Sequence, residues 1–390
     1  MLKNRYITNI IIQDLSEKMV FIGGPRQVGK TTLSKDIIAT KFDSFKYYNW
    51  DNRQDRQEII KPGWPGQAEI LILDEIHKYK KWKLFVKGEY DKLKEKYKFL
   101  ITGSARLDVY RRGGDSMQGR YHYYRLHPFS LAEACNNINR LKPFDEINIP
   151  THAENTILSA LDKFGGFPEP FIKQNSRTLR RWHNERVDRL VREDIRDMST
   201  IRDLSSMMLL CDMLPGRTAS LLSINSLRED LEVSHNALKS WLNIFESMYY
   251  CYRIYPHVSK NFRSLKKEPK LFLWDWSEIE NEAARFENLI ASHLLKFVHF
   301  LKDYEGYRVG LQYLRTAEKK EVDFLITFNN KPWFAVEVKL NKTKVSPNLK
   351  YFQSKLDIPF SFQIVKKTDI DIISDNIRVI SADRFLLGLV

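Results

Sequence analysis

A glycine-rich segment near the N-terminus, GGPRQVGKTT, has the residue types and the spacing of a phosphate-binding loop. It contains the pattern Gly-x-x-x-x-Gly-Lys-Thr between a strand-like apolar run and a helix-like run. In such a loop the backbone N–H groups surround phosphate oxygens, the lysine adds a positive charge, and the threonine hydroxyl is a Mg²⁺ ligand. The pattern predicts a site for ATP and Mg²⁺ with the loop residues Gly24, Pro25, Arg26, Gln27, Val28, Gly29, Lys30, Thr31 and Thr32.

A pair of acidic residues follows the apolar run Ile70 to Leu73 in the segment EILILDEIHK. The run predicts a buried strand that ends at this pair. We expect Asp74 to hold Mg²⁺ together with Thr31, and Glu75 to orient and deprotonate the water that attacks the phosphate. Lys30 is a further candidate catalytic residue, because its charge faces the phosphates.

The segment FLITGSARL predicts another buried strand that ends in polar residues. Adjacent strand ends would place Thr102 or Ser104 near the terminal phosphate, and Ser104 is our third candidate catalytic residue. Arginines follow, and an arginine from a neighbouring subunit can stabilise the transferred phosphate. The candidates for such an arginine finger in a homo-oligomer are Arg111, Arg112 and Arg120, and each is explained equally well as an ordinary surface residue.

Near the C-terminus, carboxylates and a lysine follow the order of the PD-(D/E)xK nuclease fold. Glu287 lies on a predicted helix, Asp323 on the strand-like segment EVDFLITF, and Glu337 and Lys339 on the next strand, AVEVKL. Asp323 and Glu337 would bind Mg²⁺, Glu287 would complete the metal shell, and Lys339 would position a water. No proline precedes Asp323, which departs from the motif. The order leaves open whether the site cuts, or binds DNA or protein without cutting.

The segment SINSLREDLEVSHNALKSWLNIFESMYY predicts a helix-turn-helix. Ser226 and Glu229 have the spacing of a capping box for the first helix, and Ser234 can cap the second. The second helix has an apolar stripe from Leu238 to Met248 and a polar opposite face, as in a recognition helix. A strand, a basic loop and a strand follow, as in a winged helix, whose alternative role is packing against protein. The predicted DNA contacts are His235, Lys239, Lys260, Arg263, Lys266 and Lys267, and Lys270 closes the same basic group.

The composition fits a protein with an anionic partner. The chain has 390 residues, which favours two or three domains, and a net charge of +14 with a pI of about 9.4. This basic excess favours nucleic acid, although many basic proteins bind none. The three cysteines show no ligand spacing. The chain has no secretory signal pattern and no apolar run near about 20 residues, so we expect a cytoplasmic protein with no membrane partner.

The expected fold class is α/β. Short apolar runs alternate with amphipathic stretches at first, which predicts a P-loop domain with a parallel sheet, with strands at MVFIGG, SFKYYNW, EILILDE and YKFLITGSA and a lysine-rich helix over 82–96. Charged, helix-compatible sequence comes next. The predicted domains are an AAA+-like ATPase domain at 1–140, a helical linker or lid at 141–220, a winged helix-turn-helix at 221–275, and a restriction-endonuclease-like α/β domain at 276–390.

Several segments resemble a family of prokaryotic AAA+-type ATPases known only as ATP-binding proteins, in which a domain of unknown function follows the ATPase. The ATPase likeness is carried by GGPRQVGKTT, LILDEIHK, FLITGSARL, GRYHYYRLHPFSLAEA and GGFPEP, and the likeness to the second domain by RRWHNERVDRLVREDIRD and the later segments. The resemblance implies ATP hydrolysis and DNA association. The alternative is an ATP-dependent switch that binds a protein partner and carries an inactive nuclease-like domain.

Overall fold

The computed structural model describes residues 4–61, 63–103, 117, 119–195, 203–258 and 268–390. The chain divides into two compact units. The first is Met1–His127 with Ser247–Tyr249 and Asp303–Glu305, and the second is Pro128–Glu246, Tyr250–Lys302 and Gly306–Val390. Some candidate residues lie outside the described part of the chain: Ser104, Arg111, Arg112, Lys260, Arg263, Lys266 and Lys267.

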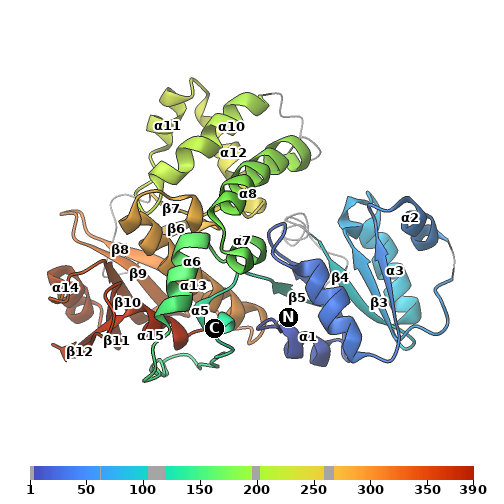
Figure 1. Cartoon of the computed structure of the whole chain (residues 1–390), viewed down its shortest axis with the longest axis horizontal. Coiled ribbons are helices and arrows are strands. Elements are labelled where there is room, and N and C mark those ends of the chain that lie inside the picture. Colours follow the sequence, from blue (N-terminus) through green and yellow to red (C-terminus); the bar gives the residue numbers. More distant parts are fainter. Residues whose placement is uncertain (1–3, 62, 104–116, 118, 196–202, 259–267) are drawn as a thin grey trace. The chain divides into compact units, whose positions relative to one another are not determined.

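The first unit contains a parallel sheet of five strands (Figure 1). The strands are β1 (Met19–Gly23), β2 (Phe45–Asn49), β3 (Ile70–Asp74), β4 (Lys98–Thr102) and β5 (Tyr121–Arg125). Their order in the sheet is β2-β3-β4-β1-β5. The first four confirm the strands predicted from the apolar runs, and β5 is not among those predicted. Because the sheet is parallel, the glycine loop after β1 and the acidic pair at the end of β3 lie at the same edge.

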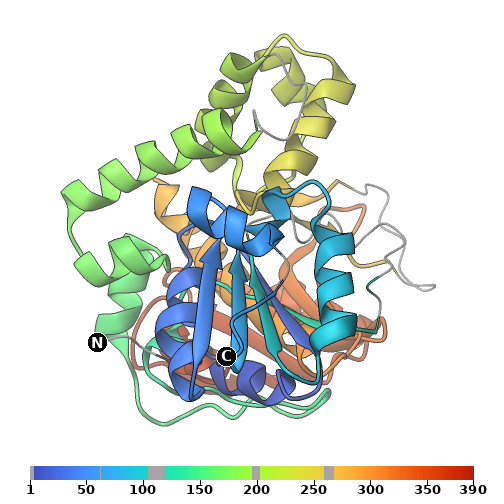
Figure 2. The same ribbon diagram turned by 90° about the vertical axis from the view of Figure 1, so that its right-hand side faces the viewer.

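Helices flank this sheet (Figure 2). They are α1 (Thr8–Asp14), the π-helix η1 (Thr32–Ile38), the 3₁₀ turns η2 (Ala39–Lys41) and η3 (Ile76–Lys78), α2 (Arg53–Ile60) and α3 (Trp82–Leu93). The predicted lysine-rich helix is α3, and its Trp82, Val86 and Tyr90 pack in one core with Phe21 and Leu73 of the sheet. The helix predicted after the glycine loop forms as η1, with α1 packed against it and against β1.

The second unit is built on a mixed sheet of eight strands. The strands are β6 (Cys251–Pro256), β7 (Lys270–Leu273), β8 (Val309–Arg315), β9 (Glu321–Phe328), β10 (Lys331–Lys339), β11 (Phe360–Val365), β12 (Asp371–Ser374) and β13 (Ile377–Ser381). The order is β12-β13-β11-β10-β9-β8-β6-β7. Strands β8, β9 and β10 are antiparallel neighbours, whereas β11 runs parallel to β10. The hairpin β6–β7, expected as a wing, therefore shares one sheet with the strands of the expected nuclease-like segment, because β6 pairs with β8.

The helices of the second unit include one long helix, α13, that fastens the edge strand β7. The side-chain amide of Asn288 accepts from the backbone N–H of Leu273 at 2.7 Å and donates to its carbonyl at 2.8 Å.

No helix in the described ranges is long and apolar enough to cross a membrane. The elements are α5 (Leu131–Ala134), α6 (Asn155–Phe164), α7 (Pro168–Lys173), α8 (Ser176–Arg189), η5 (Leu190–Ile195), α10 (Leu204–Met213), η6 (Leu214–Arg217), α11 (Ile224–Asp230), α12 (His235–Ser247), η7 (Trp276–Glu278), α13 (Glu282–Asp303), α14 (Pro347–Lys355) and α15 (Ala382–Leu387).

The predicted pair of helices after residue 222 forms, but its first cap is different. Helix α11 begins at Ile224 with Ser223 as its N-cap, whose hydroxyl accepts from the backbone N–H of Ser226 at 3.3 Å. The capping box that starts at Ser226 is therefore wrong, because an earlier serine takes that role. The Ser234 cap of α12 is confirmed by a bond from the Ala237 N–H at 3.2 Å. The predicted apolar stripe is also confirmed, since all of its members are buried: Leu238, Trp241, Leu242, Phe245 and Met248.

A buried ion pair holds α13 against α5. The ammonium of Lys296 lies 2.5 Å from a carboxylate oxygen of Glu133, and both side chains are almost fully buried. The same ammonium donates to the hydroxyl of Ser130 at 2.9 Å. Breaking a buried pair leaves one charge without compensation, which costs more than the intact pair contributes.

The variant Glu133→Ala is therefore expected to lower the free energy of unfolding by about 3–5 kcal/mol, because it leaves the Lys296 ammonium buried without its carboxylate. Chemical denaturation of the purified chain measures this. The matched control is Glu169→Ala, which removes an exposed pair with Lys173 on α7 and should cost at most about 1 kcal/mol. Equal effects from the two variants would contradict the structural role of the buried pair.

Candidate functional site

The glycine loop after β1 has a backbone that glycine alone adopts readily. Gly24 and Gly29 have φ angles of 147° and 97°. A Cβ atom on Gly24 would lie 2.5 Å from the carbonyl oxygen of Leu126, so the loop passes too close to the backbone after β5 for a larger residue. The ammonium of Lys30 donates to the carbonyls of Gly24 and Pro25 at 2.9 and 2.7 Å. The lysine is thus held at the loop that the sequence predicts to surround phosphates.

Asp74, at the end of β3, accepts hydrogen bonds from three hydroxyl groups. Thr31 and Tyr47 donate to its Oδ2 at 2.7 and 2.8 Å, and Thr102 donates to its Oδ1. Burial and the nearby Asp74 carboxylate both raise the pKa of Tyr47, so this phenol stays protonated and keeps donating. The loop threonine and the strand aspartate, 43 residues apart in the chain, are therefore in direct contact.

This oxygen set fits the Mg²⁺ ion that a phosphate-binding loop requires. Thr31 and Asp74 supply a hydroxyl and a carboxylate side by side, and Mg²⁺ prefers hard oxygen ligands completed by waters and substrate phosphates. Among the described residues, no three or more His, Cys, Asp or Glu side chains are grouped to hold a metal. A Mg²⁺ site with one carboxylate agrees with that, because the nucleotide would contribute the other charged ligands.

Glu75 follows Asp74 in a left-handed backbone conformation, with φ of 55° and ψ of 19°. Its backbone N–H donates to the carbonyl of Thr102 at 3.0 Å, which ties the turn to the neighbouring strand. Burial raises the pKa of the Glu75 carboxyl, and the nearby Lys30 opposes this. Its Oε2 is buried and has no hydrogen-bond partner among the described residues. A buried acceptor of this kind can take a proton donor such as a water molecule.

Two other predicted site residues are placed differently. Thr102 bonds to Asp74, so it orients a proposed metal ligand instead of pointing at a phosphate through a free hydroxyl. Arg120 is partly exposed and pairs with Asp91 of the same chain at 2.7 Å. Its role as an arginine finger stays a prediction. Ser104 and the other two arginines lie outside the described residues.

In the second unit, the carboxylates predicted to bind metal gather around a lysine. The Nζ atom of Lys270 lies 3.2 Å from Glu287 Oε1, 2.7 Å from Glu321 Oε1 and 3.4 Å from Asp323 Oδ1. Burial alone would lower the pKa of Lys270, but Glu287, Asp323 and Glu321 raise it well above its usual value, so it carries a charge. The grouping of Lys270 with the basic loop is wrong, because its side chain is buried within the sheet edge and not offered to phosphates.

The other two predicted residues of this cluster form a pair beside it. Lys339 lies 2.7 Å from Glu337 Oε1, and the Ser346 hydroxyl donates to the same oxygen at 3.3 Å. Burial and the nearby Asp323 raise the pKa of Glu337. Asp323 is itself anchored to this strand, since its Oδ2 accepts from the backbone N–H of Val338 at 2.8 Å. Glu287, Asp323, Glu337 and Lys339 thus belong to one continuous cluster, and their service as metal ligands stays a prediction.

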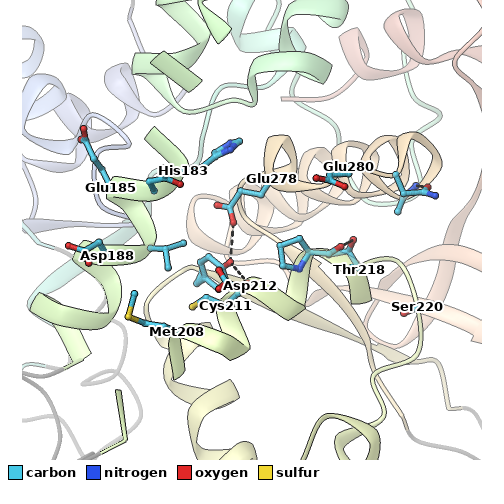
Figure 3. Close-up of a pocket in the computed structure, with 17 residues that line it drawn as sticks. His183, Glu185, Asp188, Met208, Cys211, Asp212, Thr218, Ser220, Glu278 and Glu280 are labelled. Carbon is cyan, nitrogen blue, oxygen red and sulfur yellow. Dashed lines mark hydrogen bonds between the residues drawn. The ribbon is translucent and has the colours of Figure 1, made fainter. Parts of the chain in front are cut away.

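The second unit also contains a cavity of about 1330 Å³ that sequence reasoning does not find, because its lining comes from several separate segments (Figure 3). The hydroxyl of Tyr250, which lines it, lies 3.0 Å from a carboxylate oxygen of Glu278 and 3.1 Å from the Cys211 carbonyl, so its one hydrogen can be donated to either acceptor. Among the described residues its lining contains five acids and one histidine: Glu185, Asp188, Asp212, Glu278, Glu280 and His183. An acidic lining disfavours phosphate groups, so this cavity is a poor candidate for the nucleic-acid site.

Comparison with known proteins identifies three regions of the chain. Residues 16–135 match the AAA domain family, 158–278 match a domain of unknown function (DUF8612), and 283–385 match another domain of unknown function (DUF4143). The chain is 24% identical to an uncharacterized protein of Methanocaldococcus jannaschii, over 89% of this chain and 81% of that protein. It is 22% identical to an uncharacterized protein of Haemophilus influenzae, over 83% of each.

Among solved structures, a RuvB protein of Thermotoga maritima aligns with 63% of this chain and 87% of its own, at 13% identity and a TM-score of 0.30. A likeness of this size carries no argument. The assignment depends instead on the AAA match and on the parallel sheet that brings the glycine loop to Asp74. Residues 16–135 thus match the AAA domain family and form a P-loop domain of the nucleotide-binding type.

Proposed function

We propose that this chain is a Mg²⁺-dependent ATPase that associates with DNA through its second unit. The AAA-type domain accounts for ATP. One observation supports the proposed association with DNA. Helices α10, α11 and α12 are followed by the antiparallel hairpin β6–β7, and α12 exposes a polar face. The net charge of +14 favours the same partner.

The element order supports a winged helix in this region. Leu221, just before α11, bridges Lys270 of β7 in the antiparallel sense, which adds a short third strand to the hairpin. On α12 the side chains of His235 and Lys239 are exposed, whereas Leu238 is buried on the opposite side. In a helix-turn-helix the second helix enters the major groove with its N-terminal residues nearest the bases. The exposure of His235 and Lys239 on this helix supports the proposal that they contact DNA.

The elements after the hairpin support a nuclease-like fold. Helix α13 carries Glu287, the hairpin partner β9 carries Asp323, and β10 carries Glu337 and Lys339, after which α14 leads to β11. Strand β11 pairs in parallel with β10. The order of helix, hairpin and further strand is the one expected from the motif, and this agreement supports the proposed nuclease-like fold.

In the ATPase domain each residue has a proposed role that follows from its contacts. Lys30 neutralises phosphate charge from the loop, and Thr31 and Asp74 would hold Mg²⁺, which neutralises the charge that develops on the phosphates. Tyr47 and Thr102 fix the orientation of Asp74. Glu75 orients the attacking water and accepts its proton, for which its Oε2 is suited, because it has no hydrogen-bond partner among the described residues and only longer contacts to His77 and Lys78 at 3.5 and 3.7 Å.

The variant Glu75→Gln is expected to bind ATP with unchanged affinity and to hydrolyse it about 10²–10⁴-fold more slowly, because the amide cannot accept a proton. Phosphate release and calorimetric ATP binding measure the two properties. The control Glu69→Gln removes an exposed pair with Lys98 and should leave both nearly unchanged. Hydrolysis by Glu75→Gln at the rate of the unaltered chain would exclude Glu75 as the base.

Fluorescence anisotropy with labelled duplex, branched and single-stranded DNA tests the proposed association with DNA. We expect binding at low salt that weakens steeply as salt rises, and Lys239→Ala should weaken it and reduce the salt slope by about 1. Lys173→Ala on α7, outside the helix-turn-helix, is the control and should have no effect. The absence of binding to all three DNA forms at low salt would contradict the proposal and favour the switch that binds a protein partner.

A further inference from the structure

Lys270 occupies the centre of the carboxylate cluster from a fixed position. Its backbone belongs to β7, where it pairs with Ile254 of β6 and bridges Leu221. The side chain is 3% exposed and is surrounded by Glu287, Glu321 and Asp323. A lysine on a surface loop could swing away from such a cluster, whereas Lys270 is held by strand pairing on both sides. Strand pairing therefore fixes the backbone of Lys270 beside the cluster, and its buried ammonium contacts three carboxylates.

Several of the oxygens that a divalent cation would need are already bound to protein groups. Asp323 offers Oδ1 to Lys270 and Oδ2 to the backbone N–H of Val338. Glu287 faces the same ammonium, and Glu337 Oε1 faces Lys339. Mg²⁺ takes oxygen ligands at about 2.0–2.1 Å and tolerates little distortion. The ammonium of Lys270 lies between Glu287 and Asp323, where a divalent metal ion shared by these two carboxylates would have to lie.

The charges of the described side chains also argue against a divalent cation in this cluster. Glu287, Glu321, Asp323 and Glu337 carry four negative charges when ionised. They are paired with Lys270, Lys339 and Arg315, which bonds to Glu321. One negative charge remains in excess. Without Lys270 the excess would be two, which is the charge that one divalent cation neutralises. Lys270 thus neutralises part of the negative charge that a metal ion neutralises in a carboxylate centre.

We propose that Lys270 is a built-in replacement for the metal ion of this nuclease-like centre, so that the centre is closed to divalent cations and the second unit binds DNA without cutting it. This inference rests on the proposed nuclease-like fold. The residues present do not fit a metal ion as long as Lys270 lies between them. One acceptor, Glu337 Oε2, is buried without a hydrogen-bond partner among the described residues. Glu337 Oε2 alone does not make a divalent site when both oxygens of Asp323 are engaged and Glu287 Oε1 faces Lys270.

The experiment counts Mn²⁺ ions bound to the full chain by electron paramagnetic resonance, without nucleotide. Four proteins are compared: the unaltered chain, Asp323→Asn, Lys270→Met, and the double variant with both changes. Any Mn²⁺ held weakly at the P-loop is common to all four. We expect the first two to bind equally, Lys270→Met to gain one Mn²⁺ per chain, and the double variant to lose it. Methionine is unbranched like lysine and one atom shorter, and it carries no charge.

Weaker Mn²⁺ binding by Asp323→Asn than by the unaltered chain would overturn the inference, because it would reveal an open metal site. This comparison holds even if Lys270→Met fails to fold. A folded Lys270→Met, shown by its thermal melt, that gains no Mn²⁺ would also overturn it. Nicking of supercoiled plasmid by the unaltered chain that disappears in Asp323→Asn would do the same. The Mn²⁺ count uses no DNA, so it is independent of whether the chain binds DNA.

Discussion

A carboxylate can be buried only if a proton, hydrogen bonds or a cation compensate it, and this constraint organises the second unit. Glu287 comes from a helix and Asp323 from a strand; both side chains are partly buried, and the ammonium of Lys270 compensates their charges. The same residue pairs through its backbone with Ile254 and Leu221. The segment expected as a winged helix and the segment expected as a nuclease-like domain are therefore joined by one buried charge cluster and one sheet.

The ATPase domain depends on a different constraint, the parallel direction of its strands. The ends of β1, β3 and β4 meet at one sheet edge, where Asp74 receives hydroxyl groups from a loop, from β2 and from β4. Three donors fix both oxygens of this carboxylate, so its geometry is set before a nucleotide arrives. Preorganised charge of this kind contributes to catalysis because it need not rearrange during the reaction.

Features encoded by local spacing could be predicted from the sequence. The glycine loop, the acidic pair after β3, the apolar stripe of α12, and the placement of Glu287, Asp323 and Glu337 on a helix and two strands all follow from short patterns. Lys270 could not be predicted, because in the sequence it closes a run of basic residues and only the sheet order brings it to Glu287 and Asp323. The contact between Tyr47 and Asp74 could not be predicted either, because it requires that β2 and β3 be neighbours in the sheet. Both Ser223 and Ser226 have a spacing that suits the N-cap of α11. Ser223 takes this position, and spacing alone does not decide between them.

The central claim is that one chain combines ATP hydrolysis with DNA association, and the coupling between the two tests it most directly. If both ligands bias the same conformational equilibrium, DNA changes the affinity of the chain for ATP, and we expect it also to change the rate of ATP hydrolysis. The decisive measurement is the steady-state ATP hydrolysis rate at low salt with and without duplex, branched and single-stranded DNA. The account predicts a rate that rises with DNA and loses this rise as salt increases. A rate that none of the three DNA forms changes would contradict it.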